Sequence, residues 1–129
     1  MYAIDIATGD IRWQTPTEDR CRDREGCLNG FSAAPIANAE LVFVGGLDGW
    51  LHALSADTGR RVWSFDTWRD YQAINATDTL TASGGSIDVH GPLLVEDQLF
   101  IQSGYGSFGQ KGGNALLAFR LPVKDKAAP

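Results

Sequence analysis

Ser86, Asp88 and His90 are the residues whose types and spacing point most directly to chemistry in this 129-residue chain. They occupy positions i, i+2 and i+4, so they would face one side of an extended strand. A carboxylate beside an imidazole can exchange protons with a substrate, and a carboxylate can also ligate a cation. The alternative is structural, with Asp88 and His90 bonded to backbone groups and to neighbouring parts of the fold.

Cys21 and Cys27 form a second distinctive pair, separated by five charged or small residues. This spacing matches no common zinc pattern, and the chain has only two histidines, His52 and His90, to complete a metal site. Two readings remain, a pair of free surface thiols and a small loop disulfide formed in an oxidising compartment. We expect the disulfide.

The composition is that of one globular domain rich in turns. Hydrophobic residues make up 43% of the chain and accompany 15 glycines, which favours an all-β fold. The 11 basic and 16 acidic residues give a net charge of −5 without a basic stripe, which argues against a nucleic-acid partner. No run of 18 apolar residues is present, so we expect no membrane span. The first five residues lack a signal-peptide pattern and read as strand, so we expect a fragment boundary there.

An internal repeat predicts the strands that surround these residues. Residues 2–13 align with residues 52–63 at an offset of 50, and Ala, Thr-Gly and Trp recur at the same places. A third copy begins at residues 117–119. A repeat of about 50 residues built from short strands is typical of a β-propeller blade, which is a sheet of four antiparallel strands.

The repeat predicts an all-β fold made of propeller blades, with one complete blade between two incomplete ones. The predicted strands lie at residues 2–6 and 11–15, at 33–37, 41–45, 50–54 and 61–66, and at 88–95, 98–103 and 115–120. The partial propeller would span residues 1–121, with blade parts at 2–15, 33–66 and 88–120, and residues 122–129 would be a polar tail. Unpaired edges at 2–6 and 115–120 lead us to expect that the isolated chain self-associates.

Trp13 and Trp63 stand at the same place in two copies, and we expect each ring to dock one blade against the next. The insertions at residues 16–30, 67–85 and 105–113 all fall on one face of the predicted blades. Long loops gathered on one face of a rigid scaffold are where binding sites usually lie. The three residues considered first would lie on a channel-lining strand next to that face.

The motif Ala-x4-Thr-Gly-x3-Trp at residues 3–13 and 53–63 resembles the tryptophan-docking repeat of pyrroloquinoline quinone (PQQ) dehydrogenase propellers. A closer resemblance, to the C-terminal part of polyvinyl-alcohol dehydrogenase-type quinoproteins, runs through the insertions. It rests on Cys21, Cys27 and Asn75 and on residues 30–34, 65–67, 84–88, 91–92, 103–105 and 114–119.

The resemblance implies an incomplete arc of an eight-bladed, periplasmic parent that binds PQQ, usually with calcium. Such a parent oxidises an alcohol by base-assisted hydride transfer to the quinone and passes electrons to a cytochrome c. It places Ser86 and Asp88 near the cofactor, and with His90 they are our candidate cofactor-binding residues. It maps no catalytic residue, and we expect this piece alone to be inactive. The alternative is a non-catalytic propeller scaffold for protein partners, because the repeat also resembles that of outer-membrane assembly scaffolds.

Overall fold

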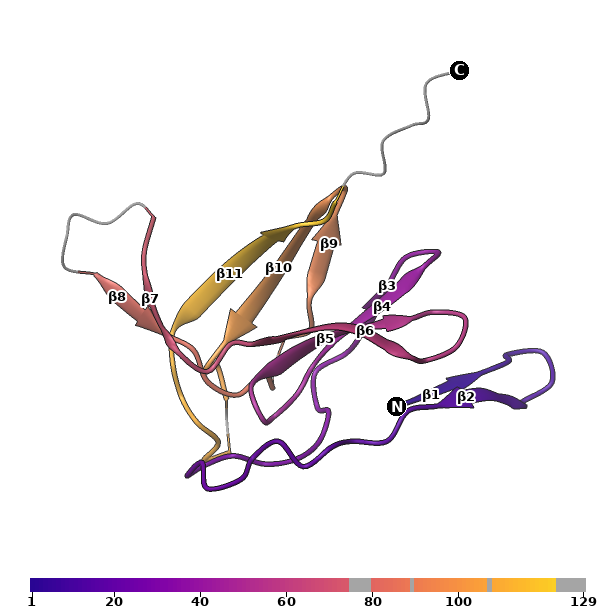
Figure 1. Cartoon of the computed structure of the whole chain (residues 1–129), viewed down its shortest axis with the longest axis horizontal. Coiled ribbons are helices and arrows are strands. Elements are labelled where there is room, and N and C mark those ends of the chain that lie inside the picture. The colour runs from indigo at the N-terminus through magenta and orange to yellow at the C-terminus, as the bar shows by residue number, and fades with distance from the viewer. Residues whose placement is uncertain (75–79, 89, 107, 123–129) are drawn as a thin grey trace, which may run out of the picture.

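Eleven strands and no helix make up the part of the chain that the computed structural model describes, residues 1–74, 80–88, 90–106 and 108–122 (Figure 1). The strands are β1 (Tyr2–Ile4), β2 (Ile11–Gln14), β3 (Ile36–Ala37), β4 (Leu41–Gly45), β5 (Trp50–Ser55), β6 (Arg61–Asp66), β7 (Asp70–Gln72), β8 (Thr81–Ser83), β9 (Leu93–Val95), β10 (Gln98–Ser103) and β11 (Ala115–Arg120).

The strands pair into antiparallel sheets that follow the sequence repeat. Strands β3, β4, β5 and β6 form one four-stranded sheet in chain order, which corresponds to the predicted complete blade. Strands β9, β10 and β11 form a three-stranded sheet, and β1 and β2 form a hairpin. The four-stranded sheet lies between the other two (Figure 1). The predicted all-β class, built of antiparallel blades, is confirmed.

The repeat is reproduced in the register of the strands. Ala3 lies opposite Trp13 in the first copy, and Ala53 lies opposite Trp63 in the second. A register shift follows the alanine in each copy. The glycine of each Thr-Gly pair has a positive φ, 79° in the first copy and 69° in the second, a conformation that a side chain would strain. The same residues therefore build the same hairpin twice.

Both repeat tryptophans contact the next sheet along the chain. The indole Nε1 of Trp13 donates a hydrogen bond to the carbonyl of Ala56, at 2.9 Å, in the β5–β6 turn. Its ring lies so close to Gly59 that a Cβ there would be 2.4 Å from the indole. The ring of Trp63 meets the edge of Phe119 on β11, with centroids 5.4 Å apart.

The core joins the four-stranded sheet to the three-stranded sheet. Its buried members are Ala33, Phe43, Leu51, Ala53, Ile87, Leu99 and Ile101. Two of them come from neither sheet: Ala33 precedes β3, and Ile87 lies between β8 and β9. A Cβ on Gly45 would lie 2.3 Å from Ile87 Cγ2, so the glycine leaves room for this side chain. The segment around Ile87 is thus a wedge between two blades.

The structure departs from the predicted strands at three places. The insertion at residues 67–85 contains the β7–β8 hairpin, where we expected a loop. Strand β9 begins at Leu93, not at residue 88. Strand β3 covers only Ile36–Ala37 of the predicted residues 33–37. The expected polar tail lies, apart from Pro122, outside the described residues.

Candidate functional site

The predicted site residues lie outside the strands. Residues 84–88 belong to no strand, and their backbone bonds to two loops instead. The N–H of Ser86 donates to the carbonyl of Lys111 at 2.9 Å, and the N–H of the next residue donates to Gly46 at 3.0 Å. Because these groups are not paired with β10, the expectation that the three site residues share one face of a strand is wrong.

Ser86, Asp88 and His90 have three different environments. The fully buried Ser86 donates its hydroxyl hydrogen to the carbonyl of Leu47 at 2.6 Å. Asp88 is also buried, and its Oδ2 accepts a hydrogen bond from Nε2 of Gln110 at 3.2 Å. His90 is exposed, and the residue between it and Asp88 lies outside the described residues. The hydroxyl of Ser86 is therefore committed to the main chain.

Two hydroxyl side chains connect the loops around residues 84–88. Thr67 directly follows β6, and Ser103 is the last residue of β10. Both side chains are fully buried. The hydroxyl of Thr67 donates to the carbonyl of Gly49 at 2.6 Å and lies 2.7 Å from the hydroxyl of Ser103. The Ser103 hydroxyl oxygen accepts from the N–H of Gly85 at 2.9 Å. Sequence reasoning missed this network, although each residue is a small hydroxyl at the end of an apolar strand.

The loop between β2 and β3 is closed by a disulfide between Cys21 and Cys27, as expected from the sequence. The Cα atoms of the two residues are 5.4 Å apart. A covalent ring of this size restricts the conformations of the charged residues inside it. The charged residues of the disulfide loop are therefore preorganised.

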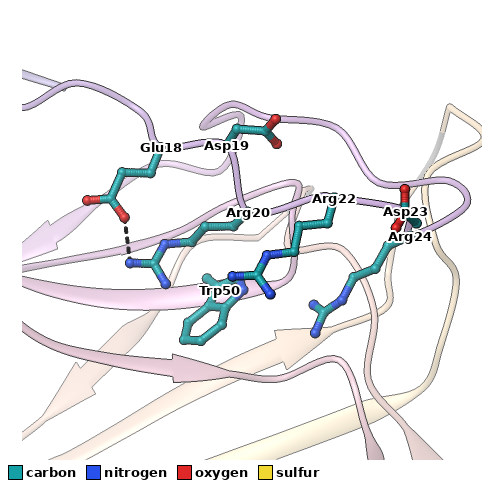
Figure 2. A pocket seen from close by; sticks show the side chains of 7 residues that line it. All are labelled: Glu18, Asp19, Arg20, Arg22, Asp23, Arg24 and Trp50. Carbon is teal, nitrogen blue, oxygen red and sulfur yellow. Dashed lines mark hydrogen bonds and ion pairs between the residues drawn. The ribbon is translucent and has the colours of Figure 1, made fainter.

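Figure 2 shows a hollow beside this loop, which we call the arginine hollow. Its volume is about 630 Å³, and it is lined by Glu18, Asp19, Arg20, Arg22, Asp23, Arg24 and Trp50. The guanidinium of Arg20 lies 4.5 Å from the ring centre of Trp50, a cation–π contact, and pairs with Glu18 at 2.7 Å. Sequence reasoning treated this loop as an insertion and did not single out its arginines.

Ion pairs with carboxylates border the hollow on both sides. Arg24 donates to both oxygens of Asp66, at 3.2 and 2.5 Å. This pairing raises the pKa of Arg24 above its usual value. On the other side, the hydrogen bond from Arg61 to Glu18, at 2.5 Å, lowers the pKa of that carboxyl. The hollow is thus bordered by charges that are already neutralised within the fold.

A buried histidine lies beneath the hollow. His52 is 2% exposed, and its Nδ1 is 2.8 Å from the hydroxyl of Ser64. Its ring is parallel to that of Trp50, with centroids 6.4 Å apart. Burial, followed by the charges of Arg61 and Arg20, lowers the pKa of His52 to about 4. It is therefore neutral near pH 7 and supports the Trp50 ring from the core.

The described residues contain neither a cluster of metal ligands nor a membrane-spanning helix. No group of three or more His, Cys, Asp or Glu side chains suited to hold a metal ion occurs among the described residues. Within the same residues, no helix has the length and apolar character needed to cross a membrane.

Two kinds of known protein are similar to this chain. Residues 1–92 match the PQQ_2 family, described as "Outer membrane protein assembly factor BamB". The crystal structure of BamB from Moraxella catarrhalis, a β-propeller, superposes with a TM-score of 0.58 and 28% identity, over 93% of this chain and 31% of that one.

The other similar proteins are alcohol-oxidising enzymes. The polyvinylalcohol dehydrogenase of Sphingopyxis sp. (strain 113P3) is 29% identical over 96% of this chain. The quinohemoprotein alcohol dehydrogenase ADH-IIG of Pseudomonas putida is 33% identical over 87% of it. The chain spans 20% and 14% of the lengths of these two enzymes. Since the family match covers most of the chain, the protein belongs to the PQQ_2 family of BamB-like β-propellers.

Proposed function

We propose that this chain is part of a PQQ-dependent alcohol dehydrogenase similar to the polyvinyl-alcohol dehydrogenases. The observation that carries the proposal is the extent of the likeness. The two dehydrogenases align over 96% and 87% of the chain, a span that takes in its long insertions as well as its strands. Loops that surround a binding site are retained for that site, whereas strands are retained for the fold.

The donor set near residue 86 fits such a cofactor in part. PQQ, when bound, would accept the hydride of the alcohol. The carboxylates and quinone oxygens of PQQ need N–H or O–H donors, and Ser86 does not fit as one because its hydroxyl already bonds to Leu47. The exposed His90 can supply such an N–H, and Asp88, whose carboxylate only accepts hydrogen bonds, would accept one from the pyrrole N–H of PQQ, while Ser86 supports the segment. We assign no calcium site here, because the described residues hold no suitable group of ligands.

The remaining features of the proposal concern the parent protein. The disulfide between Cys21 and Cys27 suits an oxidising compartment, so we place the parent in the periplasm. A relative from Thauera butanivorans, 28% identical over 87% of this chain, is named 1-butanol dehydrogenase (cytochrome c). We therefore propose an alcohol as substrate and a cytochrome c as electron acceptor. In this proposal residues 1–121 are a partial propeller and residues 122–129 a polar tail.

Changing Asp88 to Asn tests the assignment in the longer protein that contains this chain. A hydrogen-bonded ionic contact contributes about 1.5–3 kcal/mol, so we expect Asp88→Asn to weaken PQQ binding about tenfold or more in an absorbance titration. Asp97→Asn is the matched control, since Asp97 pairs with Arg120 at 3.5 Å near the β9–β10 turn. Equal PQQ affinity of all three proteins would remove Asp88 from the cofactor site. Absence of PQQ binding to the unmodified protein would overturn the proposed function itself.

Open sheet edges predict how the isolated 129-residue chain behaves. Among the described residues, β11 pairs on one side only, with β10, and Leu116 on it is 66% exposed. Such an edge accepts another strand readily. We propose that it accepts β2 of a second copy, so light scattering should show a dimer or larger species at high concentration and a smaller mass on dilution. A Leu116→Lys variant should shift this equilibrium toward the monomer, whereas a constant monomeric mass would exclude self-association.

A second function, a non-catalytic scaffold for protein partners, is favoured by the family match. The family description and the superposed crystal structure both name BamB, an assembly factor. The two functions differ in their need for a cofactor. A parent protein that binds no PQQ but co-purifies with membrane assembly proteins would support the scaffold.

A further inference from the structure

The arginine hollow carries a cationic row that the proposed function does not use. Arg20, Arg22 and Arg24 alternate along the disulfide loop. Figure 2 shows their side chains extending to the same side of the loop. Three guanidiniums therefore reach the hollow, although the whole chain has a net charge of −5 and three acidic residues also line the hollow.

The two outer guanidiniums of this row are held in fixed orientations. Arg20 is stacked on Trp50 and paired with Glu18. Arg24 is paired with Asp66, and its guanidinium lies 5.3 Å from the ring centre of Trp68. Fixed donors lose little conformational entropy when a ligand binds. The ends of the row are thus preorganised.

Arg22, in the middle of the row, differs from its neighbours. Its guanidinium forms no hydrogen bond or ion pair with any residue that the structure describes. Its backbone has a φ of 48°, a left-handed conformation that is unfavourable for a residue other than glycine. Arg22 lies within the loop that the disulfide closes, and Figure 2 shows its guanidinium between those of its neighbours.

The chemistry of the hollow selects among anions. A guanidinium binds carboxylate and phosphate groups through two parallel N–H bonds. The lining contains three arginines and three acidic residues, so its formal net charge is zero. A phosphate dianion would meet more repulsion from these acids than a carboxylate monoanion. We propose that the arginine hollow binds a carboxylate-bearing ligand, with Arg22 as the main donor.

A carboxylate can reach the hollow from two sources, and its volume of about 630 Å³ suits either a small organic acid or the side chain of an acidic peptide. Two probes with three carboxylates each separate them: tricarballylate, and an acetylated, amidated Glu-Ser-Glu-Ser-Glu peptide. Each is titrated into the full chain while NMR follows the Nε–H of Arg22 and the indole N–H of Trp50. We expect saturable shifts of both signals with at least one probe, and the tighter probe identifies the source.

Substitutions of the row decide whether the proposal stands. Arg22→Gln should weaken binding about tenfold or more, since it removes the charged donor. Arg60→Gln, at an exposed arginine in the β5–β6 turn, should leave the affinity unchanged. The proposal is overturned if neither probe shifts the two signals, if Arg22→Gln binds as well as the unmodified chain, or if inorganic phosphate binds as tightly as the carboxylates.

Discussion

Replacing Thr67 with valine should lower the free energy of unfolding by about 2–3 kcal/mol, because a buried network then loses two hydrogen bonds. Valine keeps the shape of the side chain but cannot donate to Gly49 or bond to Ser103. Both hydroxyl side chains are fully buried, so water cannot replace the lost partner. Urea unfolding followed by circular dichroism measures the change.

The control for this substitution is Thr81→Val on strand β8. Thr81 is exposed, and valine is equally suited to a strand, so the loss should stay within about 0.5 kcal/mol. Thr67→Val should also speed hydrogen exchange at the N–H of Gly85, which bonds to Ser103. A loss at Thr67 as small as that at Thr81 would show that the network does not hold the wedge segment in place.

Acidification should destabilise the fold through His52 before most carboxylates titrate. The pKa of this buried imidazole is about 4 in the folded chain, against 6.5 for the ordinary group. As pH falls below 6.5, the unfolded chain binds a proton that the folded chain does not. The stabilisation is therefore complete above pH 6.5 and is lost as pH falls toward 4, by about 3 kcal/mol in total.

Two histidine variants isolate this effect. In His52→Gln the loss between pH 6.5 and pH 4.5 should largely disappear, although the variant itself is less stable because Ser64 and Trp50 lose a partner. His90→Gln should retain the full dependence, since His90 is exposed. Unfolding free energies of the three proteins, measured at several pH values, make the comparison. A His52→Gln curve parallel to that of the unmodified chain would contradict the role of His52.

The central blade was predictable because its signals are local. Strands β4 and β5 follow from apolar runs bounded by glycine turns, and β6 follows from alternation. The pairing of Ala53 with Trp63 follows from the repeat. The hairpin β7–β8 was not predictable, because its support is remote. The N–H of Ser83 bonds to Asn114, which is 31 residues away.

The site was less predictable than the blades for the same reason. Arg24 finds its partner Asp66 across 42 residues, so the sequence alone shows only a charged loop. The spacing of Ser86, Asp88 and His90 was compatible with a strand. It could not reveal that the backbone N–H groups of this segment donate hydrogen bonds to the carbonyls of Lys111 and Gly46. The periodicity of a sequence does not predict the position of a side chain that is set by contacts between two loops.

One measurement tests the proposed function most directly. The parent protein of the proposal is expressed in a periplasm and purified without cofactor. It is then titrated with PQQ in the presence of calcium and an alcohol, while reduction of cytochrome c is followed by absorbance. We expect no reduction without PQQ and saturable, alcohol-dependent reduction with it. A folded protein that shows no PQQ-dependent change in absorbance and no cytochrome c reduction with any primary, secondary or polymeric alcohol would contradict the assignment to the dehydrogenases.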